Sequence, residues 1–155
     1  MTNGKYLRFF VALMPLITTS GIEYPSSHPA SQGIEGHIYR VSGNQMPSPD
    51  VKPSRPKGIK TALYIYPITN LSQVSRKGSS AFYTTIQTKL VKKIMSDTNG
   101  YFNAKLPVGI YSLFVKVDSL YFANLFDGEN NIFPVKVVQN KMTKVDFKMD
   151  HDANY

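Results

Sequence analysis

The clearest pattern in this chain lies within residues 96–117, where a polar turn is followed by apolar residues at every second position. The turn contains Asp97, Asn99 and Gly100, residue types that tolerate the tight backbone of hairpin turns. The apolar positions beyond it are Tyr111, Leu113, Val115 and Val117. Because a period of two places one face of a strand on a core, this segment predicts a half-buried β-strand and not a helix.

Other segments show the same preference for extended structure. Predicted strands cover residues 33–41, 61–68, 82–95, 132–138 and 142–149, and residues 120–124 continue one strand or bend it. For residues 85–95 of the predicted strand 82–95, the alternative is an amphipathic helix. The several threonine and tyrosine residues of this segment favour a strand instead. Since turn signals recur at short intervals, we expect an all-β fold, an antiparallel β-sandwich of about seven to eight strands.

The start of the chain predicts a leader followed by one domain. Lys5 and Arg8 precede an apolar stretch at 9–17 and small residues at 18–21, a pattern typical of a secretory signal peptide. A buried N-terminal strand is the alternative. No apolar run is long enough for an ordinary membrane-spanning helix. The expected organisation is a signal peptide at 1–21, a flexible linker at 22–32, a β-sandwich at 33–149 and a C-terminal tail at 150–155.

Composition narrows the functional classes. The 155 residues are 42% hydrophobic, enough for one sizeable core, and contain no cysteine. Disulfides, thiolate catalysis, thiolate zinc sites and a lipid-anchored cysteine are therefore excluded. The net charge is +8, and it stays positive at +6 without Lys5 and Arg8. The lysines are scattered over the expected outer faces of separate strands, which favours a solubility role over a nucleic-acid or other polyanion site.

The segment DTNGYFNAKLPVGIYSLFV resembles the core motif of carboxypeptidase regulatory-like domains, which are transthyretin-like (prealbumin-type) β-sandwiches. In that family a polar turn with glycine leads through a short strand and a Leu-Pro-x-Gly-x-Tyr corner into a long core strand. The segments IYRVSGNQMPSPD, KGIKTALYIYPIT and LYFANLFDGENNIFPV look like small secreted proteins of Gram-negative bacteria that carry this domain without an assigned activity. The resemblance covers roughly residues 33–149. It implies a transthyretin-like topology and a non-catalytic module, since no His-x-x-Glu of a zinc peptidase is present.

Candidates for catalysis or metal binding are few. His28, His37 and His151 show no metal-ligand spacing, and His37 is expected to be a solvated side chain on the first strand. No nucleophile elbow occurs, and the C-terminal Tyr-Arg-Gly-Ser of the transthyretin-related hydrolase is absent. We therefore expect no catalytic residue, no cofactor and no metal ligand. The turn at 127–131 offers clustered oxygens, but such turns also form without calcium, so calcium binding is left open.

A binding surface is the remaining hypothesis. The proline-rich loop 42–58 holds the basic residues Lys52, Arg55 and Lys57, and the strand at 61–68 places Tyr64 and Tyr66 on one face. These five residues are the predicted ligand or partner surface, although core packing between two sheets would consume the same tyrosines.

The predicted function follows from these observations. We expect a non-catalytic, secreted, monomeric or weakly associating binding or structural module of the cell envelope, periplasmic or extracellular. It would recognise a protein or glycan partner through loops 42–58 and 69–81. The alternative is a carbohydrate-binding accessory protein that uses an exposed tyrosine face, and a hydrolase ranks third.

Overall fold

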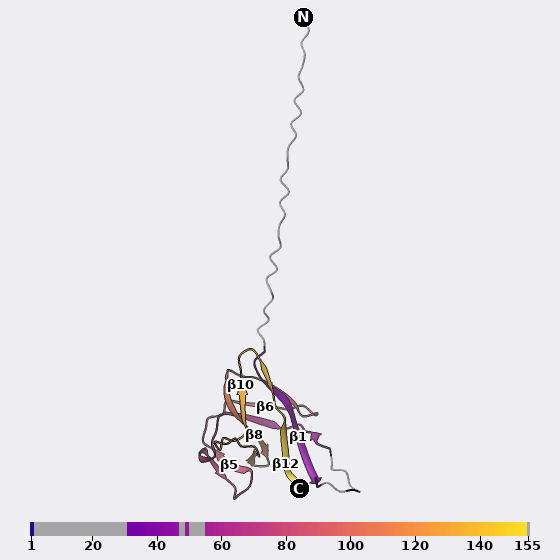
Figure 1. Cartoon of the computed structure of the whole chain (residues 1–155), viewed down its shortest axis with the longest axis vertical. Helices are drawn as coiled ribbons and strands as arrows, with labels where there is room; N and C mark the ends of the chain where they lie inside the picture. Colours follow the sequence, from indigo (N-terminus) through magenta and orange to yellow (C-terminus); the bar gives the residue numbers. More distant parts are fainter. Residues whose placement is uncertain (2–30, 47–48, 50–54, 155) are drawn as a thin grey trace.

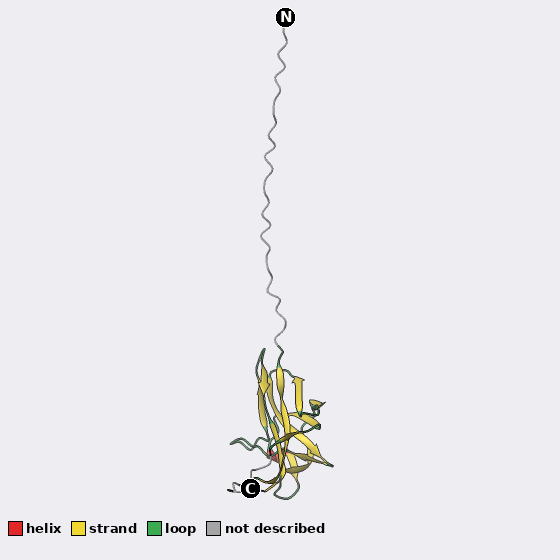
Figure 2. Cartoon of the chain, turned by 90° about the vertical axis from the view of Figure 1, so that its right-hand side faces the viewer, coloured by secondary structure: helices red, strands yellow, loops and turns green. Residues whose placement is uncertain are grey.

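The described residues form a sandwich of two β-sheets, as the cartoon of the computed structural model in Figure 1 shows. The structure describes residues 1, 31–46, 49 and 55–154. The predicted signal peptide beyond its first residue, most of the predicted linker and Lys52 lie outside these residues. Strands and loops dominate Figure 2, and the described regular structure outside the strands is one turn of 3-10 helix, η1 (Leu71–Gln73). The prediction of an all-β sandwich is confirmed.

The first sheet is built around one long strand. Its members are β1 (Gly33–Asn44), β2 (Lys57–Gly58), β7 (Tyr101–Lys105), β11 (Met142–Lys144) and β12 (Phe147–Asn154). On one side β1 pairs in parallel first with β11 and then with β12; on the other it pairs antiparallel with β7 and β2. Figure 1 shows β1 and β12 side by side. This sheet is therefore mixed, whereas the sequence predicted antiparallel pairing.

The second sheet has β8 at its centre. It contains β3 (Ala62–Pro67), β4 (Val74–Arg76), β5 (Phe82–Ile86), β6 (Lys92–Met95), β8 (Gly109–Val117), β9 (Leu120–Phe122) and β10 (Pro134–Val137). The order is β4-β5-β9-β8-β3-β6, and β10 pairs with the first half of β8. All pairs in this sheet are antiparallel. The predicted strand in 96–117 is thus a central strand of the fold.

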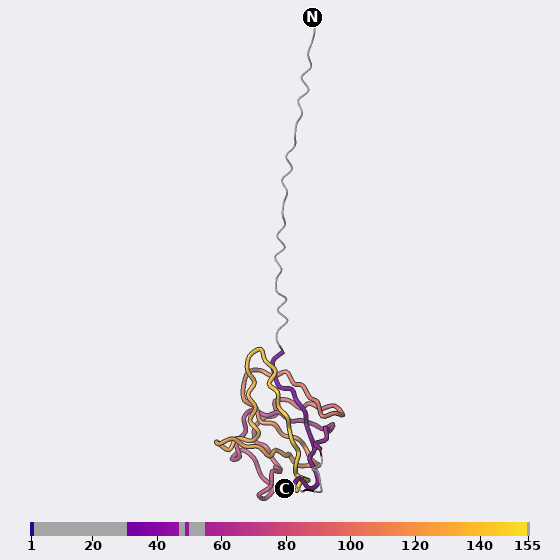
Figure 3. The backbone as a smooth tube through the Cα atoms, turned by 45° about the vertical axis from the view of Figure 1, so that its right-hand side comes forward, coloured from indigo at the N-terminus to yellow at the C-terminus, as the bar shows by residue number. Residues whose placement is uncertain are grey.

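The core lies between the two sheets. Ile38 of β1 is paired with Phe147 of β12, and both are fully buried. Leu113 and Val115 of β8 are also fully buried and belong to the same apolar cluster. The loop between β10 and β11 connects the two sheets, and Figure 3 shows it beside the start of β1. There the Gly33 amide donates to the Lys141 carbonyl at 3.2 Å.

The second sheet is also covered on its other face, by a layer of aromatic rings. Tyr64 contacts Tyr121 edge-on with ring centroids 5.3 Å apart, and Tyr66 contacts Phe114 edge-on at 5.6 Å. Tyr83 completes the layer at 5.7 Å from Phe114. Burial, followed by the hydrogen bond with the Tyr121 hydroxyl, raises the pKa of Tyr66 well above its usual range. β8, predicted to be half-buried, is therefore buried on both faces along its centre.

Strand boundaries depart from the sequence prediction at several breaks. The described residues contain twelve strands, several of only two or three residues. The predicted strand 82–95 is β5 and β6, because β5 pairs with β4 and β9 whereas β6 pairs with β3 on the other side of β8. The predicted strand 142–149 is β11 and β12, interrupted at Val145 and Asp146. The predicted tail is part of β12 as far as Asn154. Within the described part of the chain, no helix has the length and apolar character needed to cross a membrane.

Candidate functional site

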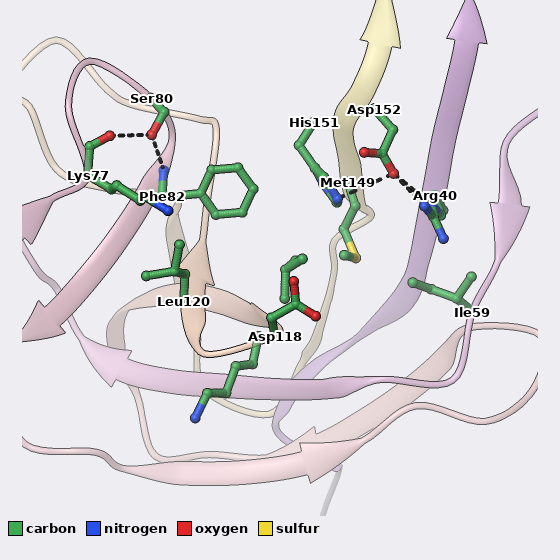
Figure 4. A pocket seen from close by; sticks show the side chains of 12 residues that line it. Arg40, Ile59, Lys77, Ser80, Phe82, Asp118, Leu120, Met149, His151 and Asp152 are labelled. Carbon is green, nitrogen blue, oxygen red and sulfur yellow. Dashed lines mark hydrogen bonds and ion pairs between the residues drawn. The ribbon is translucent and has the colours of Figure 1, made fainter.

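A pocket of about 650 Å³ lies between the two sheets, and Figure 4 shows the side chains around it. One wall comes from β1 and β12, which supply Arg40, Met149 and Asp152. The opposite wall comes from the β4–β5 and β8–β9 hairpins, which supply Lys77 and Asp118. The pocket is thus built from segments that are far apart in the sequence.

A bulge in β12 turns two neighbouring side chains into the pocket. Arg40 pairs with Met149 but Ser42 pairs with Asp152, so β12 carries one residue more than β1 between these pairs. Successive side chains of a regular strand point to opposite faces, and an extra residue breaks that alternation. His151 and Asp152 therefore both line the pocket, as Figure 4 shows.

Arg40 and Asp152 form an ion pair on the rim. The Arg40 Nε donates to Asp152 Oδ2 at 3.1 Å, and one terminal guanidinium nitrogen donates to the same oxygen. His151 Nε2 lies 3.5 Å from that oxygen. The hydrogen bond from Arg40 lowers the pKa of Asp152, and the charges of His151 and Arg40 act in the same direction.

This lowered pKa predicts a pH-dependent contribution to stability. A carboxyl group with a lower pKa in the folded state stabilises the fold above its unfolded-state pKa, and the effect disappears as the pH falls through the folded value. Asp152→Asn is therefore expected to lower the thermal midpoint at pH 7 by a few degrees at most, since the pair is exposed. The difference between the two proteins should shrink as the pH falls below the ordinary aspartate pKa of about 4. A difference that is the same at pH 7 and at pH 2.5 in parallel thermal melts would contradict the role of the charge.

His151 is held mainly by aromatic packing. Its side chain is 14% exposed, and its ring lies 5.4 Å from Phe82 and 5.2 Å from Phe122. Its Nδ1 is buried and has no hydrogen-bond partner among the described residues. Such an unsatisfied atom costs about 1–3 kcal/mol, so the surrounding rings must compensate for it. The imidazole points into the pocket in Figure 4 and forms part of its wall.

The opposite wall presents one carboxylate and two ammonium groups, of which that of Lys116 lies over the Tyr121 ring at 5.7 Å. Asp118 lies in the tight turn between β8 and β9 with φ 52, and Figure 4 shows its side chain pointing into the pocket. Within the described ranges, neither the Asp118 carboxylate nor the Lys77 ammonium has a hydrogen-bond or ion-pair partner. Between them the lining is apolar, with Phe82 and Leu120 on this side and Met149 opposite. The pocket can therefore hold an apolar group while it pairs with charges of both signs.

Comparison with known proteins gives no match. This holds for protein-family models, curated proteins and solved structures alike. Membership of the carboxypeptidase regulatory-like family therefore stays a prediction from the sequence motif.

Among the described residues, the predicted surface is divided between the two sheets. Lys57 lies in β2 opposite Arg40, which places it beside the rim of the pocket, and Arg55 is exposed nearby in sequence. Tyr64 and Tyr66 are only 9% and 5% exposed, because they belong to the aromatic layer on the second sheet. The two tyrosines therefore form no exposed face, as expected for residues that are used in packing.

The sequence pattern did not predict the pocket residues, for reasons that can be identified. His151 and Asp152 fall in the segment that was predicted to be a tail, and no periodicity marks the bulge that orients them. Asp118 directly follows the alternating apolar residues that predict a strand, and nothing in that alternation marks the turn that it occupies. Loop 69–81 was predicted as a binding loop, and it does contribute Lys77 and Ser80 to the pocket.

The acidic turn at 127–131 is held by its own hydrogen bonds. Asp127 Oδ1 accepts from the amides of Glu129 at 2.9 Å and Asn131 at 2.8 Å, and Asp127 Oδ2 accepts from Asn131 Nδ2 at 2.9 Å. The side-chain bond from Asn131, followed by its backbone bond, lowers the pKa of Asp127. Across the described ranges, no three histidine or acidic residues are grouped closely enough to hold a metal ion.

Proposed function

We propose that this protein is a secreted, non-catalytic binding module of the bacterial cell envelope that recognises a protein partner. The pocket between the two sheets would receive a short polypeptide segment of that partner. One observation carries the proposal: a single pocket combines an apolar floor with the free carboxylate of Asp118 and the free ammonium group of Lys77.

A polypeptide segment suits this chemistry better than a small ion. The volume of about 650 Å³ lies within the range of ordinary ligand sites, which are mainly apolar with a few placed polar groups. An apolar side chain can fill the floor near Phe82 and Met149, while charged side chains or a chain terminus meet Lys77 and Asp118. The lining holds cationic as well as carboxylate side chains: Arg40, Lys77 and Lys116 beside Asp118 and Asp152. A segment that carries both charges and an apolar group therefore matches this lining more fully than a simple anion does.

The state of the polar groups favours binding over catalysis. The Ser80 hydroxyl supports its own hairpin, because it donates to the Lys77 carbonyl at 2.6 Å. Arg40 and Asp152 are occupied with each other. No described contact joins Ser80 to His151, so the arrangement offers no activated nucleophile.

The proposal also includes the protein family and the cellular location of this chain. The corner at Pro107 and Gly109 leads directly into β8, as the carboxypeptidase regulatory-like motif would require. The leader pattern at 1–21 supports secretion. A monomer that presents the pocket to a partner in the periplasm or outside the cell is consistent with these features.

Selection from a library of random linear peptides displayed on phage, with the full chain as bait, tests the proposal. We expect peptides with an apolar residue flanked by charged residues. Asp118→Asn and Lys77→Gln should each weaken a selected peptide about three- to tenfold in calorimetry, as for one lost charge pair at the rim.

The matched control is Lys105→Gln, which removes an exposed lysine of β7 that does not line the pocket. It should leave peptide affinity unchanged. The proposal fails if no peptide is enriched, or if selected peptides bind both pocket variants as tightly as they bind the original chain.

A further inference from the structure

A second pocket lies on the outer face of the first sheet, away from the space between the sheets. Its volume is about 450 Å³, and it is open to solvent. The side chains used below that line it are Glu35, His37, Tyr101, Lys144 and Asp146. None of these residues lines the pocket between the sheets.

The pocket forms where β11 ends and β12 has not yet begun. The Val145 amide donates to the Glu35 carbonyl at 2.9 Å, and the next contact along β1 is the His37 amide donating to Asp146 Oδ1 at 3.1 Å. At this point the Asp146 carboxylate therefore accepts the hydrogen bond that a backbone carbonyl of a neighbouring strand would otherwise accept. A Cβ on Gly36 would lie only 1.8 Å from the Val145 carbonyl oxygen, so this close approach requires glycine. The hollow is therefore built into the sheet and does not depend on a flexible loop.

A row of aromatic rings borders the hollow. His37 and Tyr39 are two residues apart on β1 and stack with centroids 5.6 Å apart and planes 15° apart. His37 is paired with Tyr101 across to β7, and their rings meet edge-on at 5.5 Å. Tyr101 is 39% exposed and the His37 side chain 41%. Rings with this much exposed surface are available for contact with a ligand.

Fixed carboxylates surround these rings. The Tyr101 hydroxyl donates to Glu35 Oε2 at 3.2 Å, which orients the ring. Asp146 is held by the His37 amide, and its side chain is 57% exposed. Among the described residues, Glu35 Oε1 and Asp146 Oδ2 accept no hydrogen bond. Lys144 is the one ammonium group among the residues that line this pocket, so negatively charged hydrogen-bond acceptors outnumber positively charged donors there.

We propose that this outer-face pocket binds a neutral hexopyranose unit of a glycan. The C–H face of a pyranose ring packs on the electron-rich face of an aromatic ring, and its hydroxyls donate to carboxylates in strong, charge-assisted hydrogen bonds. Phosphates of a nucleotide or carboxylates of a uronate would instead meet Glu35 and Asp146. This site is independent of peptide binding between the sheets, so either assignment can fail alone.

The test is NMR titration of the full chain with maltohexaose, cellohexaose and chitohexaose, and with polygalacturonate as an anionic probe. At least one neutral oligosaccharide should bind, with amide shifts confined to residues 35–39, 101 and 144–146. Tyr101→Ala should weaken binding about five- to tenfold, the loss of one stacking contact. Tyr101→Phe keeps the ring and should lose about threefold or less, and Glu35→Gln should weaken binding by a similar factor.

The matched control is Phe126→Ala, since Phe126 is an aromatic residue with a similar exposure of 41% on a different loop. It should bind as the original chain does. The inference is overturned if none of the three neutral oligosaccharides causes amide shifts at a concentration of about 10 mM, which would detect even a very weak affinity. It is also overturned if shifts map elsewhere, if polygalacturonate binds more tightly, or if folded Tyr101→Ala binds normally. Should Tyr101→Ala not fold, the shift map and Glu35→Gln decide the question.

Discussion

Replacing Gly100 with alanine is expected to reduce the free energy of unfolding by about 3 kcal/mol or more. Gly100 has φ 85, which alanine rarely adopts, and a Cβ there would lie 2.3 Å from the Ile38 carbonyl oxygen. The turn cannot move away freely, because the Gly100 carbonyl accepts from the Ile38 amide at 2.8 Å. Urea unfolding followed by circular dichroism measures the loss.

Gly78→Ala separates backbone strain from the close approach. Gly78 also has a positive φ, of 65, but a Cβ there meets nothing within 4 Å. Its substitution should cost about 1–2 kcal/mol, the strain alone. Equal losses in the two variants would show that the contact of Gly100 with β1 contributes nothing.

Replacing Phe147 with alanine is expected to cost about 3–5 kcal/mol, the usual effect of emptying a large buried site. Phe147 is fully buried, stacks on Phe133 with centroids 4.5 Å apart, and lies 6.4 Å from Phe122. Its strand neighbour across the pair is Ile38, so the loss would affect both the core and the β1–β12 pairing. Thermal or urea unfolding gives the difference.

The exposed Phe126 provides the comparison for Phe147. Phe126→Ala should change stability by no more than about 0.5 kcal/mol, as is usual for surface positions. If Phe147→Ala unfolded as reversibly and at the same urea concentration as Phe126→Ala, the packing around β12 would have to be different from that described.

Local patterns were sufficient to predict β3, β8 and β10 of the second sheet. The alternation after Gly109 predicted β8, and the lysines expected on outer strand faces, Lys116, Lys136, Lys144 and Lys148, are all exposed. Hairpin turns and period-two alternation are set by neighbouring residues, so they can be read from short segments.

Features set by distant segments could not be predicted. Parallel pairing of β1 with β11 and β12 leaves no local mark, because neither strand is joined to β1 by a turn. Alternation placed Tyr64 and Tyr66 on one face, but only the tertiary structure shows that rings from β5 and β9 bury that face. The orientation of His151 depends on one extra residue in β12, which composition does not reveal.

The pairing of β1 also has a consequence for the order of folding. The bond between the His37 amide and Asp146 spans 109 residues, and β12 begins only after it. During synthesis, one edge of the first sheet must therefore stay without a partner until nearly all of the described chain has been made. Such long-range pairing slows folding and leaves an open strand edge available to other chains. We therefore expect refolding yield to fall steeply with protein concentration, even though the finished fold is well packed.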